Sequence, residues 1–472
     1  MAGKGTTGAS RSGGRKLDTP VFAQPQPTAD PTVFRVPHPS DADAYKLIDE
    51  LNKEHKIVPL PFPAPRAKGS EPALTLADVF GGNANAMTSI QHNGQLVFHA
   101  TGDCGSVRGP ATQNAVTDKM IGDFTESGAK EVPQFCLLLG DIVYNFGETQ
   151  YYYDQFYEPY RNYPAPVLAV AGNHDGMISP LAHETSLAAY LRNFCADSAA
   201  GFTVTPEAGG LSRTAQIQPG VFFTFDAPFV RVLVVYSNTL EDPGVISDAN
   251  IGTTQLAFLQ AALQRVKDEK FAGALLFAHH HPCYAFGGQH SSSVAMRQQM
   301  DAICAKVGVW PHAVLTGHAH SYQRFTRHRA DGTDIPYVTC GNGGHNVVKL
   351  QPGAGTTLRV PQTFQTATAT DDAVTFENYD DTNYGYLRIV VDTQQLRIEY
   401  HPASDGTGVK SPDDSVTIDL QTRKQAAYRA NDLGLPAQAE SARMMHARQR
   451  GSQHAPQHGQ AAAKRKSVKG SG

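Results

Sequence analysis

The middle of the chain repeats one pattern of hydrophobic and polar positions. A short apolar, β-prone run ends in Gly, Asn, Asp or His, and a polar or amphipathic stretch follows it. The apolar runs lie at residues 95–101, 135–139, 166–171, 230–236, 273–278 and 313–316. Helices are predicted between them at residues 112–126, 148–158, 182–194, 252–267 and 293–306. This alternation of strands and helices predicts an α/β fold.

The segments on either side of this region have different patterns. After it only strands are predicted, which indicates extra sheet edges or a second sheet that completes a sandwich. These strands lie at residues 336–340, 384–391, 395–400 and 415–420. Before it, residues 36–94 show one helix at 40–54 and then a proline-rich extended segment. We therefore predict a main domain at 95–422, with 36–94 as an N-terminal extension packed on the core.

Both ends of the chain differ from this core in composition. Residues 1–35 are rich in Gly, Ser, Thr and Pro, so we expect them to be disordered. Residues 421–472 carry ten Lys or Arg against two acidic residues, a charge of +8 in a protein whose formal net charge is −4. The segment 423–472 is therefore predicted to be a disordered basic tail, with contact to anionic surfaces such as nucleic acid or membrane as a second interpretation.

The composition otherwise describes a folded chain in a reducing environment. Hydrophobic residues make up 40% of the 472 and charged residues 18%, which is enough apolar surface for a core. No apolar run is long enough to cross a bilayer, and no conventional signal peptide starts the sequence. Six scattered cysteines form no Cys-x-x-Cys pair, and no Asn-x-Ser/Thr sequon occurs. We expect a cytoplasmic protein, or one exported without a conventional signal peptide.

Polar groups follow the apolar runs in five short segments, each just past the carboxyl end of a predicted strand. The segments are GDCG (102–105), GDIVY (140–144), GNHD (172–175), HHHP (279–282) and GHAH (317–320). In an open α/β sheet ligands bind outside these strand ends, so the segments are predicted to converge. Asp, Asn, His and Tyr without a convergent Cys favour hard or borderline metals, and one Asp can bridge two cations about 3.5–4 Å apart.

These five segments resemble the motifs of the calcineurin-like metallophosphoesterases and, within that superfamily, the purple acid phosphatases. The family motifs are GDxG, GDxxY, GNH(D/E), VxxH and GHxH. Four are intact, and the fourth departs because the chain reads Phe-Ala-His-His at 277–280. His280, two residues before Pro282, matches the family's H-x-P better than its rival His279. The resemblance implies an αββα sandwich with mixed β-sheets and a dinuclear metal site at the strand carboxyl ends.

The resemblance also implies a role for each matching residue. Asp103, Tyr144 and His320 would hold Fe(III), Asp141 would bridge, and Asn173, His280 and His318 would hold a divalent Zn, Fe or Mn. The charge of the ligand set supports a trivalent ion in this position. Gly105 stands where most of the superfamily has a neutral His ligand, and Tyr144 takes that ligand's place. A tyrosine phenolate adds a negative charge that a trivalent ion balances. His174 would assist the leaving group, and His290 resembles the family's second substrate-side histidine.

The function implied is hydrolysis of small phosphomonoesters by a metal-activated hydroxide, as in purple acid phosphatases. Residues 95–422 would then form a metallophosphoesterase catalytic domain. The alternative is a dimetal phosphodiesterase or nucleotide pyrophosphatase on the same fold, which would not need Tyr144. A calcineurin-type protein phosphatase fits less well, because GDIVYNFG lacks the Arg of that group's GDxVDRG. A non-catalytic anion or nucleic-acid binder would have no need of seven metal ligands.

Overall fold

A computed structural model of the protein describes residues 42–429, apart from 55, 67–68, 127–130, 181, 288–289, 351–357, 366–371 and 404–411. The chain divides into two units, Met1–Ala427 and Tyr428–Gly472. The segment 1–35 and all but the start of the basic tail lie outside the described residues, and the fold below is that of the first unit.

A nine-stranded mixed sheet forms one half of the unit. Its strand order is β1-β5-β6-β7-β8-β10-β9-β12-β11. The strands in that order are β1 (Ala73–Thr75), β5 (Phe223–Ala227), β6 (Val230–Val234), β7 (Ala274–Ala278), β8 (Ala313–Thr316), β10 (Asp334–Cys340), β9 (Tyr322–His328), β12 (Ala373–Asp380) and β11 (Gln362–Gln365). The strands β6, β7, β8 and β10 are parallel to one another, which directs their carboxyl ends to one edge.

A seven-stranded sheet forms the other half, in the order β16-β15-β14-β13-β2-β3-β4. Its strands are β16 (Lys424–Gln425), β15 (Asp414–Asp419), β14 (Gln395–Pro402), β13 (Gly385–Asp392), β2 (Gln95–Thr101), β3 (Cys136–Leu139) and β4 (Val167–Val170). The strands β2, β3 and β4 are parallel, and the remaining neighbours pair antiparallel.

Alternate side chains of these strands face two different cores. Val232 and Leu276 belong to the core between the two sheets, together with Phe98 of β2 and Ile389 of β13. Leu233 and the other outward-facing side chains pack in the cluster that contains the helices. This period of two is what a strand buried on both faces requires, so the layers run helix, sheet, sheet, helix.

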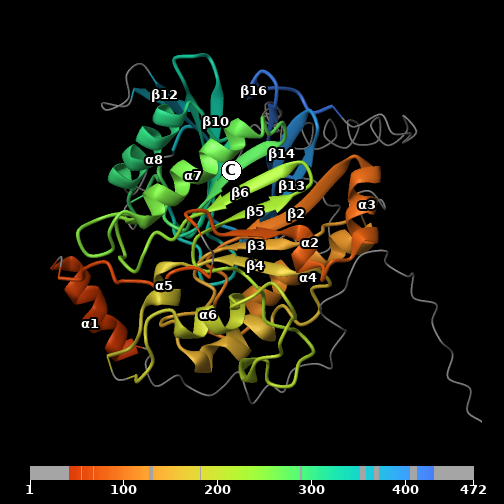
Figure 1. The fold of residues 1–472 in the computed structure, drawn as a ribbon. Coiled ribbons are helices and arrows are strands. Elements are labelled where there is room, and N and C mark those ends of the chain that lie inside the picture. The colour runs from red at the N-terminus through yellow and green to blue at the C-terminus, as the bar shows by residue number, and fades with distance from the viewer. Residues whose placement is uncertain are drawn as a thin grey trace, which may run out of the picture. The chain divides into compact units, whose positions relative to one another are not determined.

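Helices cover the outer faces of both sheets (Figure 1). The longest are α4 (Ala111–Glu126), α7 (Thr254–Asp268) and α8 (Val294–Val307). The others are α1 (Ala42–Lys53), α2 (Leu76–Val79), α3 (Ala84–Asn93), α5 (Asn173–Gly176), α6 (Ala188–Phe194), the 3₁₀ turns η2 (Thr149–Tyr151) and η4 (Pro206–Ala208), and the π-helical turn η3 (Tyr153–Tyr157). Among the described residues, no helix combines the length and the apolar character that a bilayer span needs.

The αββα sandwich with mixed sheets is confirmed, and each of the six apolar runs forms a strand. Two helices differ from expectation. Residues 148–158 form a 3₁₀ turn and a π-helical turn, and only 188–194 of the predicted 182–194 is helical. The short strand β1 joins the edge of the nine-stranded sheet, so part of the N-terminal extension belongs to the sheet itself. The proposed boundaries at 94/95 and 422/423 stay predictions.

Candidate metal centre

The five polar segments meet at the carboxyl ends of parallel strands from both sheets. From the seven-stranded sheet, β2 leads to Asp103, β3 to Asp141 and Tyr144, and β4 to Asn173 and His174. From the nine-stranded sheet, β7 leads to His280 and β8 to His318 and His320. All these side chains are buried. The centre therefore lies where the two sheets adjoin, as the strand-end argument predicts.

The Tyr144 hydroxyl lies at the middle of one group of ligand atoms. It is 2.9 Å from Asp103 Oδ1, 3.0 Å from Asp141 Oδ2 and 3.2 Å from His320 Nε2. His320 Nε2 is itself 3.2 Å from Asp103 Oδ1. These separations are close to the roughly 3 Å between neighbouring ligands of an octahedral cation with bonds of about 2.1 Å. The four side chains are thus arranged as ligands of one ion would be.

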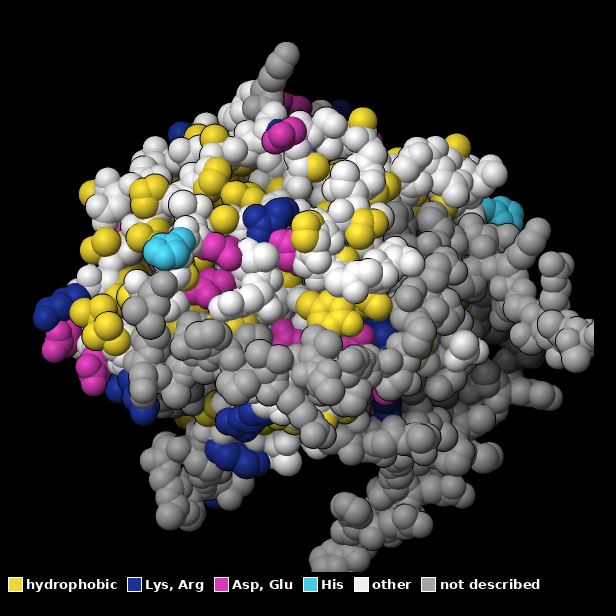
Figure 2. All heavy atoms as spheres, turned by 90° about the horizontal axis from the view of Figure 1, so that it is seen from below, with side chains coloured by type: hydrophobic (Ala, Val, Ile, Leu, Met, Phe, Trp, Pro, Cys, Tyr) yellow, Lys and Arg dark blue, Asp and Glu magenta, His cyan; other side chains and the backbone are white. Residues whose placement is uncertain are grey.

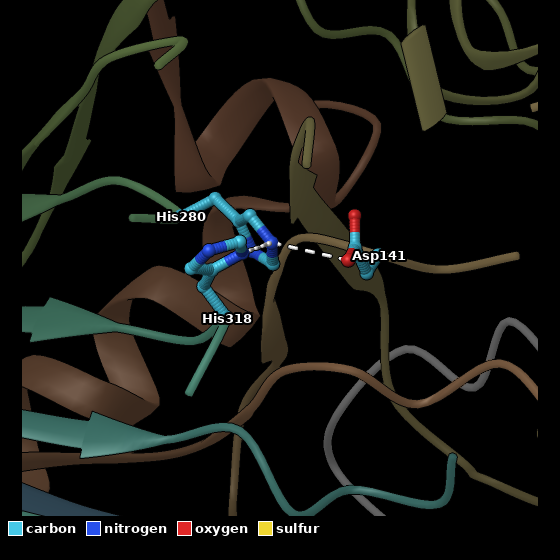
Figure 3. Close-up of side chains that lie close together, drawn as sticks. All are labelled: Asp141, His280 and His318. Carbon is cyan, nitrogen blue, oxygen red and sulfur yellow. Dashed lines mark hydrogen bonds and ion pairs between the residues drawn. The ribbon is translucent and has the colours of Figure 1, made fainter. Parts of the chain in front are cut away.

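A second group forms around the other side of Asp141 (Figure 3). His280 Nε2 lies 3.1 Å from Asp141 Oδ2 and 3.3 Å from His318 Nδ1. Ligand atoms of these three residues all lie within 4.8 Å of one another, which makes them a candidate metal-holding group. Asp141 Oδ2 belongs to both groups, because it also contacts the Tyr144 hydroxyl. A bridging position between two ions is consistent with this placement.

Asn173 and His174 begin the short helix α5 beside the second group. The Asn173 side chain is buried and its Oδ1 has no hydrogen-bond partner among the described residues. A buried, unpaired carbonyl oxygen is costly unless a cation or water meets it. The His174 backbone N–H donates to Asp141 Oδ1 over 2.9 Å, and its ring Nδ1 lies 2.7 Å from the Asn145 carbonyl. His174 Nε2 is left facing the cluster, 3.9 Å from Asp141 Oδ2.

The charges of the two groups depend strongly on burial. Burial alone would raise the pKa of Asp141, but the imidazoles of His280 and His174 outweigh it and hold the pKa below its usual range. Burial opposes a charged His280, while Asp141 and Asp103 raise its pKa to about 10. The carboxylates of Asp141 and Asp103 therefore stabilise a positive charge at this site. Burial, then Asp103 and Asp141, raise the pKa of Tyr144, so ionising the phenol requires a strong Lewis acid.

The pKa of His318 is shifted in the opposite direction from that of His280. Burial lowers its pKa well below the ordinary value, and the surrounding imidazoles of His281, His290, His280 and His320 lower it further. A neutral imidazole is the form that binds metal. The donor set of two carboxylates, one phenol, one amide oxygen and three imidazoles therefore fits a pair of hard or borderline ions.

The structure separates the two candidate histidines of the fourth segment. His280 meets Asp141, whereas the ring of His279 turns away, with Nδ1 2.7 Å from the His281 carbonyl oxygen and Nε2 3.9 Å from Cys283 Sγ. His290 lies beside the cluster, its ring centroid 4.3 Å from that of His318. All six cysteines are unpaired, as expected for a chain without a disulfide scaffold.

Several residues that support the site carry no motif of their own. Gln155 of η3 holds the Tyr144 backbone at both ends, since its Oε1 accepts from the Tyr144 N–H at 2.8 Å and its Nε2 donates to the Tyr144 carbonyl at 2.5 Å. His345 stacks on the Tyr144 ring at 3.6 Å between centroids. The sequence signal that could have identified His345 is its place shortly after the carboxyl end of β10, in the Gly-rich run 341–344 and the residue that follows it.

Comparisons with known proteins show which family and which relatives the chain is similar to. A family model described as calcineurin-like phosphoesterase matches residues 96–322. Purple acid phosphatase 22 of Arabidopsis thaliana is 22% identical over 308 residues, which is 63% of this chain and 60% of that protein. Probable purple acid phosphatase 20 of the same plant is 24% identical over 260 residues, 54% of this chain and 51% of that protein. The structure of purple acid phosphatase PPD1 from yellow lupin (Lupinus luteus) seeds aligns with a TM-score of 0.46 and 18% identity, covering 72% of this chain and 57% of that one.

Residues 96–322 therefore form a calcineurin-like phosphoesterase domain. Within the superfamily it is purple acid phosphatase-like. The chain spans between 51% and 60% of the length of the two curated relatives it matches. The activity and substrates of the whole protein are accordingly matters for proposal.

Proposed function

We propose that the protein is a metal-dependent phosphomonoester hydrolase of the purple acid phosphatase type. Its cofactors would be Fe(III) and a divalent Zn, Fe or Mn ion, and its substrate a small phosphate ester. The observation that most supports this proposal is the contact of the buried Tyr144 hydroxyl with Asp103, Asp141 and His320. A dimetal diesterase has no use for a phenol at the centre of a ligand group.

The proposed ligands divide as the two groups do. Asp103, Tyr144 and His320 would hold Fe(III), Asp141 would bridge, and Asn173, His280 and His318 would hold the divalent ion. When bound, the two ions would polarise the phosphoryl oxygens and lower the pKa of a water. Burial of every ligand keeps bulk water from screening these charges.

Two histidines are proposed to act on the substrate. The contact of His174 Nδ1 with the Asn145 carbonyl fixes the ring, so that Nε2 can donate a proton to the leaving-group oxygen. Neither nitrogen of His290 has a hydrogen-bond partner among the described residues, although the side chain is buried. An imidazole with both nitrogens available is suited to contact phosphoryl oxygens.

The visible absorption spectrum of oxidised protein, with iron and zinc assayed on the same sample, tests this proposal. A phenolate bound to Fe(III) gives a charge-transfer band that colours the protein purple. We expect the band in the native protein and its loss in Tyr144→Phe with iron retained. Tyr152→Phe is the matched control, because Tyr152 is equally buried and its hydroxyl bonds to no described residue. That variant should keep the band.

A fully metallated native protein that holds iron without the band, or only divalent ions, would contradict the ferric assignment. The dimetal phosphodiesterase or nucleotide pyrophosphatase would then be the better hypothesis. Rates on phosphate monoesters and diesters separate the two, because the first proposal requires the monoester to be the faster substrate.

Compartment and tail function are also proposals. The composition supports a cytoplasmic protein, and a tail that contacts anionic surfaces through its +8 charge. On the face drawn in Figure 2, the described basic and acidic side chains are interspersed rather than gathered by sign. Binding to anionic vesicles by the full chain, compared with a chain ending at residue 429, tests the role of the tail.

A further inference from the structure

A sixth strand end also reaches the metal centre, and its residues match no motif. After β6 the chain runs through residues 235–242 to Asp242, whose side chain is 22% exposed. Asp242 Oδ1 lies 3.6 Å from His318 Nε2, and Asp242 Oδ2 lies 3.6 Å from His290 Nδ1. The carboxylate thus stands between a proposed metal ligand and a proposed substrate contact.

The two nitrogens of His318 have different surroundings. Nδ1 faces His280 Nε2 at 3.3 Å, the atom that also meets Asp141, so Nδ1 points into the ligand group. Nε2 has no hydrogen-bond partner among the described residues, and the side chain is buried. An imidazole that binds a metal through Nδ1 carries its proton on Nε2 and needs an acceptor there. The carboxylate of Asp242 lies a few tenths of an ångström beyond hydrogen-bond length from it.

Asp242 also holds the loop that carries His290. Its Oδ1 accepts hydrogen bonds from both the backbone N–H and the hydroxyl of Ser291, each 3.0 Å long. These two bonds fix the residue next to His290, while Oδ2 faces the His290 ring. One carboxylate therefore connects three strand ends, those of β6, β7 and β8, through side chains that serve different purposes.

We propose that Asp242 is a positioning residue that orients the ligand His318 and the substrate-side His290 together. This inference rests on the proposed function. Through Oδ1 it would select the tautomer of His318 that presents Nδ1 to the divalent ion. Through Ser291 it would hold His290 at a fixed distance from that ion. Partners of this kind contribute roughly 10–100-fold to metal affinity.

The two halves of this role can be separated by substitution. Asp242→Asn keeps the shape but removes the charge, and we expect divalent affinity to fall 10–100-fold, with kcat reduced as well. Ser291→Ala removes only the hydroxyl bond to the loop. It should leave divalent affinity unchanged and raise KM, because it affects His290 and not His318. Asp248→Asn, in the same connection, is the control, since the Asp248 side chain bonds to the nearby Asn250 and Ile251 and, among the described residues, to no part of the metal centre.

The measurement is competition for Zn(II) between the protein and a chelator of known affinity, read as zinc retained per chain. It does not depend on activity. Thermal unfolding in excess chelator shows whether each variant folds as the native chain does, and Asp248→Asn should match the native protein throughout. If native protein retains no divalent ion or hydrolyses no monoester, the proposed function fails.

If native protein does both and Asp242→Asn retains zinc as tightly with unchanged kcat and KM, the positioning role alone is wrong. A third outcome also overturns it. Asp242, His290 and His318 place ligand atoms within 4.8 Å of one another, as a metal site of their own would. Native protein with three ions per chain, and Asp242→Asn with two, would make Asp242 a ligand rather than a positioning residue.

Discussion

Three residues of the candidate metal centre adopt a backbone conformation that side chains rarely take. Asp103, Asp141 and His318 have φ values of 55°, 53° and 67°, in the left-handed region. Such a conformation costs about 1–2 kcal/mol for a residue with a Cβ. Backbone hydrogen bonds hold two of them, because the His318 N–H donates to Asp103 Oδ2 and the His174 N–H to Asp141 Oδ1. Three of the eight described non-glycine residues with positive φ are thus proposed ligands.

The glycines that open four of the motifs serve two different purposes. Of Gly102, Gly140, Gly172 and Gly317, only Gly140 has a positive φ, 95°. The others allow close approach instead. A Cβ on Gly172 would lie 2.1 Å from Asp141 Oδ1, and one on Gly317 would lie 2.7 Å from Asp103 Oδ2.

We therefore predict that Gly172→Ala displaces Asp141. The added methyl group cannot fit beside the carboxylate, so metal content should fall and the free energy of unfolding should drop by about 1–3 kcal/mol. Metal per chain and urea denaturation measure the two effects. Gly109→Ala is the comparison. Gly109 has a positive φ, and a Cβ added there would have no atom within 4 Å, so this variant should lose stability without losing metal. Full metal content in Gly172→Ala would contradict the prediction.

At the scale of elements, an irregular helix supports the most distinctive residue of the site. Residues 148–158 have aromatic positions at helical spacing, which predicted one regular helix. The chain instead forms a π-helical turn at Tyr153–Tyr157, in which Phe156 and Tyr157 stay in the core. Gln155, in the same turn, bonds to both backbone groups of Tyr144. π-Helical turns are often found at functional sites.

Gln155→Ala should loosen Tyr144. It leaves two buried backbone groups unpaired, at about 1–3 kcal/mol each in unfolding free energy. We expect lower stability in urea and a weaker or shifted visible band in the metal-loaded protein. Gln264→Ala removes an exposed side chain whose hydrogen bond, within the described part of the chain, is to Asp268, and it should change neither quantity. An unshifted band in Gln155→Ala would show that its hydrogen bonds do not orient the phenol.

The elements that the sequence predicted well are those buried on both faces, because such strands read as unbroken apolar runs. Strand β9, Tyr322–His328, is not an unbroken apolar run, because it contains Arg324 and Arg327. Its Arg324 pairs with Asp414 and its Arg327 with Asp301 and Asp372, so buried cations are satisfied by partners far along the chain. A local pattern cannot show such pairs. The strand was therefore not predicted from the sequence.

The same distinction applies to the metal centre. The sequence predicted that seven proposed ligand residues converge, because each follows an apolar run. The structure joins six of them in one connected group and places the seventh, Asn173, next to His174, whose N–H donates to Asp141. Their roles as ligands stay predictions. Asp242 also follows an apolar run, residues 230–236, but Ser-Asn-Thr-Leu-Glu-Asp matches no motif. Only the packing of β6 beside β7 shows that it reaches His318. Motifs can therefore indicate candidate ligands, whereas the residues that orient them depend on tertiary structure.

For the whole molecule, buried neutral histidines tie stability to pH. His312 precedes β8, and its Nδ1 accepts from the Leu275 N–H at 2.9 Å. Burial and, after it, the nearby Arg423 lower its pKa to about 3. The unfolded chain has a His pKa near 6.5, so it binds the proton more readily than the folded chain between these values. Stability should therefore fall as the pH falls from about 6.5 toward 3.

His312→Asn tests this dependence, because Asn can keep an acceptor for the Leu275 N–H and cannot titrate. Between pH 7 and pH 5 the native protein should lose about 2 kcal/mol more unfolding free energy than the variant. Urea denaturation at the two pH values measures the difference. The other buried histidines affect both proteins alike, so they cancel in this comparison. Equal losses of unfolding free energy would show that His312 does not contribute to the pH dependence.

The metal centre also joins the two sheets. Four of its proposed ligands follow strands of the seven-stranded sheet and three follow strands of the nine-stranded sheet, so ions bound there would link both halves. A ligand that binds only the folded state stabilises it, by roughly 4 kcal/mol at a thousand times its dissociation constant. Chelation should therefore lower the melting temperature, and iron with zinc should restore it. In Asp141→Asn, which lacks the bridging carboxylate, the chelator should have much less effect. An equal drop in that variant would mean that the stabilising ions bind elsewhere.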